Sequence, residues 1–535
     1  MSVRRAGWLA ALVFLLLLWL GCGQIYRPVV IPCSTGGVPG CPVETNPTPA
    51  NFHWVLGIST NVPNYPGAAM QIDVSGDSVV GETPASDASK PNLGDNPTHA
   101  AISPNNSKVF VASAGSVLPG GLDVISSFTP VLQSTLATGL GTVNTMTLPS
   151  GSQPVFLNTT QNNALYVANF GTNSVSSINT NSNVVTITAA VGVNPVALAE
   201  TPGATQNGSQ KIYVANQGDS TVSSLNAVDL TSNNLTGFTG VTPVWVVARG
   251  DSQKVYVLTQ GDGKLVTIDT ATDTATTPDC SATPTLCVGP GANFLFYDPY
   301  LNRLYVTNPV SGMVYVFSDT GPTADIPTLL KAISISAAAS SPCTATSGCS
   351  PVTPVSVTAL ADQSRFYVAS YQTATACPDP NVMGACVIPE LTVFDANSFA
   401  VKYPSAPSLT LLTWPPACTP TSTTSCPPTG WPFATNQYAV PPVPSCVTAA
   451  TYSPATTRFR MFTVAAADSS RVYVSMCDAG AVAVVNTTDA NTNNSGNGLP
   501  PDTLATDLLA AYGAGPVQPD GQTAPQNPIF LFMGQ

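Results

Sequence analysis

The chain has few of the side chains on which most catalytic centres depend. It is 535 residues long but contains only 2 histidines, His53 and His99. Its glutamates are Glu44, Glu82, Glu200 and Glu390. This inventory excludes a copper or zinc centre with several histidine ligands, and a general acid/base pair would have to consist mainly of aspartates. Because the sequence also has no Gly-x-Ser-x-Gly elbow, phosphate loop or calcium loop, we predict no catalytic residue, no metal site and no cofactor.

Charge is equally sparse. Charged residues make up 8% of the chain, and 28 acidic against 16 basic residues give a net charge of −12. Lys and Arg form no cluster, although nucleic-acid binding depends on neutralising phosphates with such residues. We therefore exclude nucleic acid as a partner.

What the chain does contain is a repeat, a short cassette built around an aromatic residue followed by Val. The aromatic residues of its seven copies are Phe110, Tyr166, Tyr213, Tyr256, Tyr305, Tyr367 and Tyr473. The shortest spacing, from Tyr213 to Tyr256, is 43 residues, which is the length of one four-stranded propeller blade. Short runs rich in Val, Ile and Tyr alternate with turns of Gly, Asn, Asp and Ser, which indicates strands. The first strand of several repeats begins with proline, as at Pro97, Pro154 and Pro243, where proline costs no hydrogen bond.

Both ends of the chain contain strand-like segments outside the seven cassettes. Residues 53–82 resemble the second, third and fourth strands of a blade, and residues 528–533 resemble a first strand. Joining them would close the ring and remove its exposed edge. We therefore predict an all-β propeller of four-stranded blades with seven clear repeats and a closing blade from both termini, eight in all, with seven as the alternative. One short helix is expected over residues 503–512, where Leu504 and Leu508 have helical spacing.

Three of the cassettes carry the motif of a known family. Tyr-Val-Ala-Asn occupies residues 166–169 and 213–216, and Tyr-Val-Thr-Asn occupies residues 305–308. Over residues 97–490 the chain resembles the YVTN-type bacterial surface β-propellers, a WD40-like repeat family. The resemblance implies a propeller fold and says little about the ligand, because such repeats are a scaffold used for many ligands.

The N-terminus resembles a bacterial lipoprotein signal. Arg4 and Arg5 precede an apolar stretch from Trp8 to Leu20 that is too short to span a bilayer. The stretch ends in Gly21 and Cys22, and the resemblance implies that Cys22 becomes the lipid-bearing first residue of the mature protein. An ordinary cleaved signal or an uncleaved anchor is the alternative.

We accordingly predict three segments. Residues 1–21 form the lipoprotein signal peptide, residues 22–50 a Pro-rich tether, and residues 51–535 a single β-propeller domain with disulfide-closed loop insertions. Loss of residues 1–21 would leave 14 basic against 28 acidic residues, a net charge of −14. The expected product is exported and anchored to a membrane by its lipid, in the periplasm or at the cell surface.

Cysteines are even in number once Cys22 is set aside, since 13 less one leaves twelve, which predicts disulfides in an exported protein. The expected local pairs are Cys33–Cys41, Cys280–Cys287, Cys343–Cys349, Cys377–Cys386 and Cys418–Cys426. Cys446, at the start of an inner strand, is expected to meet Cys477 at the end of the neighbouring strand. Blade topology places the pairs from Cys280 onward at one edge of the ring. Metal binding is the competing interpretation, but no Cys-x-x-Cys spacing occurs and no histidine lies near a pair.

Several other residues invite a functional interpretation. Asp219, Asp262 and Asp478 follow the second strand of three repeats, which would suit a repeated cation site, although Gly-Asp-Ser and Gly-Asp-Gly are ordinary hairpin turns. His99 lies on an inner strand and is expected to be structural, with the channel as its alternative environment. The cassette tyrosines are expected to pack between blades with their hydroxyls on backbone partners.

Two classes of function remain. The first is a monomeric, lipid-anchored binding or interaction scaffold in the bacterial cell envelope, with an envelope protein or a glycan as partner. The second is an extracytoplasmic propeller enzyme similar to lactonases or quinoproteins, with its reactive centre in the channel. The sequence favours the first, because the scarcity of His and Glu weakens the second. Convergent carboxylates at the channel mouth would favour metal-dependent hydrolysis, whereas a polar, uncharged lining would favour binding.

Overall fold

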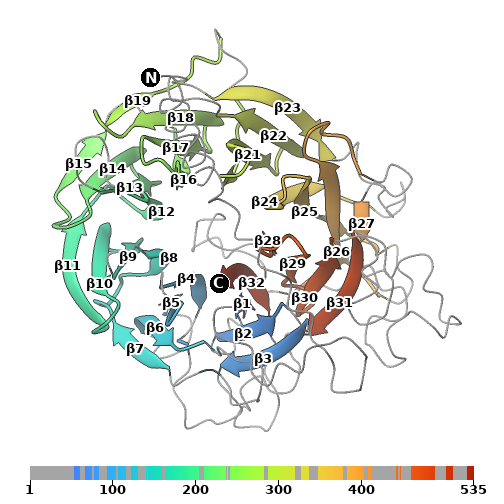
Figure 1. The fold of residues 1–535 in the computed structure, drawn as a ribbon, viewed down its shortest axis with the longest axis horizontal. Helices are drawn as coiled ribbons and strands as arrows, with labels where there is room; N and C mark the ends of the chain where they lie inside the picture. Colours follow the sequence, from blue (N-terminus) through green and yellow to red (C-terminus); the bar gives the residue numbers. More distant parts are fainter. Residues whose placement is uncertain are drawn as a thin grey trace, which may run out of the picture.

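The computed structural model of this protein is a ring of eight four-stranded antiparallel sheets (Figure 1). It describes residues 54–534 with gaps, and the gaps of nine residues or more are 84–92, 131–139, 336–347, 411–441, 447–459, 488–501 and 510–526. All elements of this described part are strands. Within the same ranges, no helix is long and apolar enough to cross a membrane. The predicted signal peptide and tether lie outside the described residues.

Each sheet is one blade, and its strands are called inner, second, third and outer from the centre of the ring. The inner strands are β4 (Pro97–Ile102), β8 (Pro154–Thr159), β12 (Pro195–Glu200), β16 (Pro243–Ala248), β20 (Phe294–Asp298), β24 (Thr353–Ala359), β28 (Met461–Ala465) and β32 (Pro528–Gly534). The second strands are β1 (Trp54–Ser59), β5 (Val109–Ala114), β9 (Ala164–Asn169), β13 (Lys211–Asn216), β17 (Lys254–Thr259), β21 (Arg303–Asn308), β25 (Arg365–Ala374) and β29 (Arg471–Met476). The third strands are β2 (Ala68–Asp73), β6 (Asp123–Phe128), β10 (Ser174–Asn179), β14 (Thr221–Asn226), β18 (Lys264–Asp269), β22 (Met313–Ser318), β26 (Cys386–Asp395) and β30 (Ala481–Asn486). The outer strands are β3 (Ser78–Thr83), β7 (Asn144–Thr147), β11 (Val184–Ala190), β15 (Ser232–Leu235), β19 (Thr274–Thr276), β23 (Thr328–Ser334), β27 (Ser408–Thr410) and β31 (Thr503–Leu509). A blade is named below by its inner strand.

Both termini close the ring, as the sequence predicted. The inner strand β32 pairs antiparallel with β1, with Trp54 opposite Gly534 and Gly57 opposite Leu531. Any side chain at residue 534 would collide with the Trp54 indole, because a Cβ there would lie 2.1 Å from it. Each inner strand contacts the next around the whole circle, including β28 with β32 and β32 with β4. The protein is therefore an eight-bladed propeller, and the seven-blade alternative is wrong.

Burial explains why the strands do not follow a simple apolar–polar alternation. All six residues of β17 and β29 are buried, because neighbouring blades cover both faces of each sheet. In the outer strand β11, exposed and half-buried residues alternate strictly, because one of its sides faces solvent. The Val, Ile and Tyr content of the cassettes thus reflects packing between blades.

The expected helix over residues 503–512 is wrong. Residues Thr503–Leu509 form β31, which pairs along its length with β30, from Asn486 opposite Thr503 to Ala481 opposite Leu509. The leucine spacing was compatible with a helix, but the third strand of this blade needed an outer partner. Pairing to that edge overrides the local periodicity.

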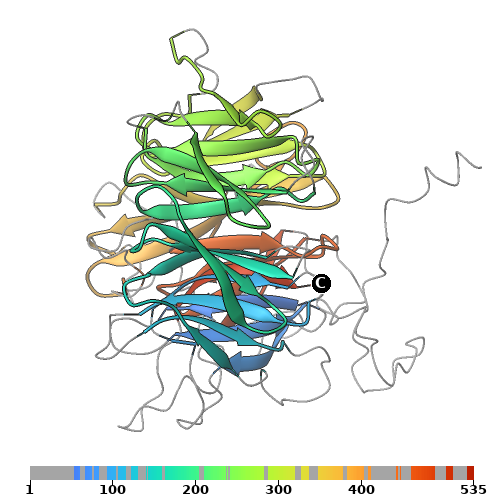
Figure 2. The ribbon, with the colours of Figure 1, turned by 90° about the vertical axis from the view of Figure 1, so that its left-hand side faces the viewer.

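The direction of the chain gives the ring two different edges, which Figure 2 shows from the side. All inner strands begin at one edge, so the loops that lead into them and the turns between second and third strands lie there too. Three disulfides close loops at this edge, Cys280–Cys287, Cys377–Cys386 and Cys446–Cys477. We call it the disulfide edge, and the edge where the inner strands end the opposite edge.

Candidate functional site in the central channel

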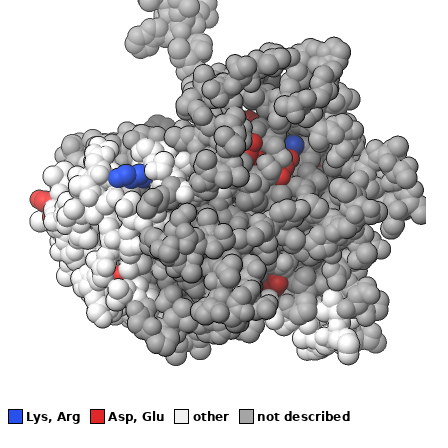
Figure 3. All heavy atoms as spheres, turned by 90° about the horizontal axis from the view of Figure 1, so that it is seen from below, with Lys and Arg blue, Asp and Glu red and all other residues white. Residues whose placement is uncertain are grey.

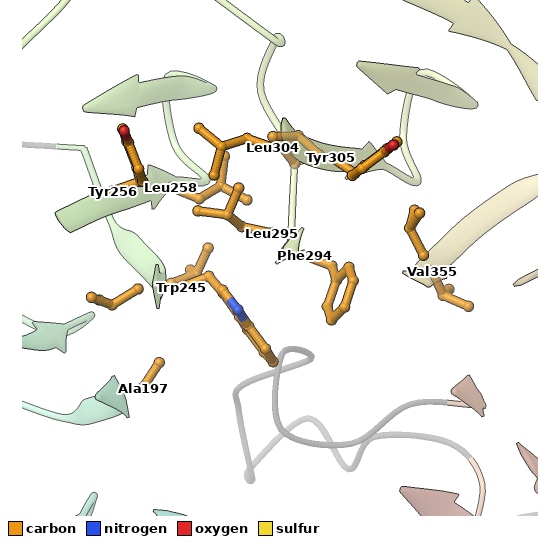
Figure 4. Close-up of a cluster of buried hydrophobic side chains, with 14 of the residues drawn as sticks. Ala197, Trp245, Tyr256, Leu258, Phe294, Leu295, Leu304, Tyr305 and Val355 are labelled. Atoms are coloured by element: carbon orange, nitrogen blue, oxygen red, sulfur yellow. The ribbon is translucent and has the colours of Figure 1, made fainter. Parts of the chain in front are cut away.

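A closed circle of six aromatic side chains lies in the centre of the propeller. Each ring contacts the next, with centroid distances of 4.0 Å for His99–Phe156, 5.7 Å for Phe156–Trp245, 5.1 Å for Trp245–Phe294, 5.8 Å for Phe294–Phe462, 4.6 Å for Phe462–Phe530 and 4.4 Å for Phe530–His99. We call this set the aromatic circle. Its members come from six of the eight inner strands. Figure 4 shows Trp245 and Phe294 pointing toward the middle, with Tyr256 and Tyr305 farther out.

A bulge at the start of the inner strands accompanies this arrangement. In the blades of β4, β8 and β16, the register shifts between a first-position proline and the third residue, which is His99, Phe156 or Trp245. The pairing of β32 shifts likewise between Pro528 and Phe530. A bulge leaves one residue unpaired and re-aims its neighbours. Proline tolerates this position because it has no N–H to lose, so the motif Pro-x-aromatic delivers a ring to the channel.

Two blades interrupt the circle with small side chains. The corresponding residues are Ala197 on β12 and Ser356 on β24, each following the same bulge. Phe156 and Trp245 meet across the Ala197 position, and Phe294 and Phe462 meet across the Ser356 position. The circle therefore closes with six rings instead of eight.

A cavity of about 450 Å³ lies against the aromatic circle. Besides the six rings, its walls are residues 157–158 of β8, 198–200 of β12, 246–248 of β16 and 295–297 of β20. Each of these follows the circle position along its strand, so the cavity extends from the circle toward the opposite edge. Most of the lining is apolar, and the polar side chains in it are His99, Asn158, Glu200 and Tyr297.

His99 is a neutral member of the circle. Its side chain is buried, and burial lowers its pKa to about 3. The Nδ1 atom accepts a hydrogen bond of 3.3 Å from the Leu157 amide, so the neutral imidazole carries its proton on Nε2. The alternative placement of His99 at the channel is thus correct. His53, the other histidine, lies outside the described residues.

Glu200 is the carboxylate of the cavity. It is the last residue of β12, and its Oε1 atom is buried with no hydrogen-bond partner. Desolvation raises its pKa to about 8. A carboxyl group with such a pKa is neutral in a large fraction of molecules at neutral pH, and it gains from any ligand group that pairs with it. The composition suggested that acid/base chemistry would fall to aspartates, but the acid at this site is one of the rare glutamates.

The predicted disulfides are present wherever the structure describes both cysteines. The pairs Cys280–Cys287, Cys377–Cys386 and Cys446–Cys477 have Cα–Cα distances of 5.8, 5.3 and 5.6 Å. Cys349 is also disulfide-bonded. The other candidates, Cys33, Cys41, Cys343, Cys418 and Cys426, and the lipidation candidate Cys22 lie outside the described residues.

One detail of the Cys446–Cys477 expectation is wrong. Cys446 was placed at the start of an inner strand, but β28 begins only at Met461. The two cysteines still meet, because Cys477 directly follows β29 and Cys446 lies in the loop that leads toward the same edge. A loop before an inner strand and a turn after a second strand share an edge wherever the strand begins.

The three turn aspartates are engaged by their own surroundings. Asp219 accepts hydrogen bonds from the Val193 amide and the Thr221 hydroxyl. Asp262 accepts a hydrogen bond from Thr259 and pairs with Lys264. Asp478 pairs with Arg460 at 2.7 Å and accepts a bond from the Val443 amide. Across the described ranges, no group of three or more His, Cys, Asp or Glu could hold a metal ion. The structure therefore agrees with the interpretation as turn residues.

The cassette tyrosines form a second circle, between the blades. Tyr166 donates to the Ala227 carbonyl of the next blade, as expected. Four others reach a carboxylate instead, and a basic side chain shares each carboxylate. These interblade clamps are Tyr213 and Lys211 on Asp273, Tyr256 and Arg249 on Asp319, Tyr367 and Arg365 on Asp502, and Tyr473 and Arg471 on Asp77.

Turn geometry explains why aspartate sits opposite these tyrosines. Asp77, Asp273 and Asp502 each have a positive φ, of 45°, 55° and 60°, immediately before an outer strand. Asn and Asp tolerate this left-handed conformation better than most residues. The backbone preference of the turn therefore supplies an acceptor for the neighbouring blade.

The aromatic circle and Glu200 were missed from the sequence. The signal for the circle was present in the triplets Pro97-Thr-His99, Pro154-Val-Phe156 and Pro243-Val-Trp245, whose third residue is aromatic. For Glu200 the only hint was its position at the end of an inner strand.

Comparisons with known proteins add no family. No protein-family model matches this chain, and no curated protein matches its sequence. Among solved structures, the dihydro-heme d1 dehydrogenase NirN is similar over 90% of this chain and 79% of its own, with 12% identity and a TM-score of 0.47. A candidate 6-phosphogluconolactonase from Bacteroides fragilis is similar over 91% of this chain and 99% of its own, with 11% identity and a TM-score of 0.46.

The propeller domain of Cps50 (Swd1) from Myceliophteria thermophila is similar over 59% of this chain and 87% of its own, with 9% identity and a TM-score of 0.41. At such low identities and TM-scores these similarities carry no information about activity. The class of the protein, a β-propeller, follows from its own sheet topology.

Proposed function

We propose that this chain is a lipid-anchored extracytoplasmic β-propeller, of the YVTN type, that serves as a monomeric binding scaffold in the bacterial cell envelope. The observation that supports this most is the position of the three disulfides, all at one edge of the ring. Disulfides persist in oxidising compartments outside the cytoplasm. Loops held by such bonds lose little conformational entropy when they bind, so a stapled edge suits recognition of a partner.

The partner in this proposal is an envelope protein or a glycan that contacts the disulfide edge. Two exposed apolar side chains in turns between second and third strands support this, Met383 with 94% and Val310 with 76% of its surface accessible. Charged residues are only 8% of the chain, so binding at this edge would depend mainly on apolar contact and hydrogen bonds. Figure 3 shows the side of the ring from below, where few of the described residues are charged.

A matched set of substitutions tests the binding edge. Met383→Asp and Val310→Asp should each weaken capture of the envelope partner by the purified ring at least about tenfold. Val228→Asp is the control, because Val228 is 80% exposed but lies in the turn between β14 and β15, at the opposite edge. Equal capture by all three variants would count against the proposed binding edge.

Anchoring is proposed to depend on Cys22, which ends the apolar N-terminal stretch. In a Cys22→Ser variant, metabolic labelling with a fatty acid should disappear and the protein should leave the membrane fraction. A variant that stays in the membrane with its N-terminus intact would instead indicate an uncleaved signal anchor.

The enzyme alternative, a lactonase-like or quinoprotein-like activity, depends on Glu200. A carboxyl group with a pKa of about 8 in a cavity has the properties of a general acid or base. The described lining, however, includes no Lys or Arg that could bind a phosphorylated lactone. Hydrolysis of 6-phosphogluconolactone by the wild-type protein and its loss in Glu200→Gln would establish this alternative in place of the scaffold.

A further inference from the structure

We propose that the channel cavity is a binding site for a small organic cation, whose apolar body lies on the aromatic circle and whose positive group lies beside Glu200. This site is separate from the proposed binding edge, because the cavity extends from the circle toward the opposite edge. The scaffold proposal could fail while the cavity still binds its ligand, and the reverse also holds.

The size and walls of the cavity suit a small molecule. Its volume of about 450 Å³ lies in the range of ordinary ligand pockets. The six rings of the aromatic circle form one side, and Leu157, Leu198, Val246 and Leu295 belong to the other walls. Such a surface binds apolar groups by removing them from water and orients flat groups by ring stacking.

The charges around the cavity favour a cation over an anion. No Lys or Arg is among the described residues that line it, and the His99 imidazole is neutral because its pKa is lowered to about 3. The faces of aromatic rings carry partial negative charge and attract cations. The net charge of −12 of the chain adds a field of the same sign.

Glu200 supplies the specific contact. The Glu200 side chain is half-buried, and its Oε1 atom is shielded from solvent without a hydrogen-bond partner, although buried polar atoms normally have one. A cation seated in the cavity would favour the ionised carboxylate and offset its desolvation.

Other titratable groups near Glu200 do not compete for this role. Burial and the neighbouring Glu200 carboxylate raise the pKa of Tyr166 of β9, and the Tyr166 hydroxyl donates to the Ala227 carbonyl. Lys211 of β13 is bound to Asp273 at 2.8 Å. Tyr297 of β20 donates to Asn302, and burial raises its pKa to about 12.

Arg249, which follows β16, is engaged in the same way. Its guanidinium is paired with Asp251 at 2.8 Å and with Asp319 at 3.0 Å. Glu200 is therefore the titrating group that a cavity ligand would meet near neutral pH.

Three probes of similar size and different charge test the proposal on the full ring by isothermal titration calorimetry. They are benzyltrimethylammonium, benzyl alcohol and phenylacetate. We expect benzyltrimethylammonium to bind at least about tenfold more tightly than benzyl alcohol, and phenylacetate to bind least. Absence of binding by all three, or tighter binding of phenylacetate, would overturn the proposal.

Variants then locate the site. At pH 9, where Glu200 is mostly ionised, Glu200→Gln should weaken benzyltrimethylammonium binding about tenfold and leave benzyl alcohol unchanged, because it removes charge at constant size. Glu390→Gln is the matched control, since Glu390 is also a buried carboxyl without hydrogen-bond partners but does not line the cavity. Trp245→Ala should weaken both probes, since it removes a ring from the circle.

A gain-of-function variant guards against misfolding as an explanation. Asn158 lines the same cavity, and Asn158→Asp adds a second carboxylate to it. This variant should bind benzyltrimethylammonium more tightly than the wild type. If Glu200→Gln and Glu390→Gln weaken cation binding equally, or Asn158→Asp has no effect on it, the cavity is not the cation site.

Discussion

Two concentric circles of side chains hold this propeller together, and they follow the repeat differently. The interblade clamps reuse one residue type, tyrosine, at one position of the second strand, in Tyr213, Tyr256, Tyr367 and Tyr473. The aromatic circle varies from blade to blade, with His99, Phe156 and Trp245 at matching positions and Ala197 breaking the series. Packing between neighbouring blades makes a similar demand on each blade, so one buried aromatic residue recurs at this position of the second strand. Channel positions face a space shared by all eight blades, so they can differ, and the candidate site lies among them.

Removal of β32, the inner strand of the closing blade, should have the largest effect, because this strand affects both circles. Truncation after Gln526 removes β32 and with it the buried Ile529, Phe530 and Leu531. Loss of their burial should cost at least about 5 kcal/mol and lower the melting temperature by well over 10 °C, or abolish cooperative unfolding. Thermal unfolding followed by circular dichroism measures this. Removal of Gln535 alone is the control, and an equal melting curve for both truncations would contradict this role of β32.

The second-largest loss of stability is expected when one interblade clamp is removed. Asp319 is fully buried and accepts bonds from Arg249 and Tyr256, so Asp319→Ala should destabilise the protein by about 3–5 kcal/mol by leaving a buried guanidinium short of a partner. Asp251 is bound to the same arginine but is 43% exposed, so Asp251→Ala should cost about 1 kcal/mol or less. Urea unfolding of both variants makes the comparison.

A buried carboxyl between blades should make stability depend on pH. Desolvation raises the pKa of Glu390 from 4.5 to about 7. The folded state therefore holds this proton longer than the unfolded state, and stability is full below pH 4.5 and falls as pH rises toward 7. The loss amounts to roughly 3 kcal/mol above pH 7. Glu390→Gln should remove this loss, so the stability of the variant relative to the wild type should increase as pH rises.

Urea unfolding at pH 4.5 and pH 8 tests this gain. Asp395→Asn is a control of opposite sign, because hydrogen bonds from Ser398 lower the pKa of Asp395 and its contribution is lost as pH falls. A constant difference between Glu390→Gln and wild type at both pH values would refute the assigned pKa shift.

The smallest expected effect is on ligand affinity in the cavity beside the aromatic circle. Because Glu200 has a pKa of about 8, the affinity for benzyltrimethylammonium should rise about tenfold between pH 6 and pH 9, as the carboxyl ionises. The probe itself does not titrate, and Glu200→Gln should give a flat profile. A pH-dependent profile that survives in Glu200→Gln would assign the dependence to another group.

Much of the fold could be predicted from local patterns. The spacing of the cassettes, including Tyr213 and Tyr256, identified four-stranded blades, and the unpaired strand patterns at both ends identified the closure. The local cysteine pairs followed from their short spacing, and their common edge followed from the direction of the chain. The helix over residues 503–512 failed because leucine spacing is a local signal and strand pairing in the blade is not.

The candidate site could be predicted from the sequence only in part. The sequence placed His99 on an inner strand and left its environment open, whereas the structure stacks it between Phe156 and Phe530. Phe530 lies more than 400 positions away from His99 in the chain, and no local pattern joins them. The clamps were half predicted, since tyrosines between blades were expected but their aspartate acceptors were not.

The sequence by itself determined the repeat, the four-stranded blade and the edge that carries the disulfides, and the structure decided between seven and eight blades. These properties depend on strand propensity, turn chemistry and chain direction, which act over tens of residues. Only the tertiary structure decided that six rings from six blades meet in the channel and that Glu200 ends beside them without a partner. Such contacts exist only after the ring closes, because each side chain comes from a different blade and its neighbours are set by the circle as a whole.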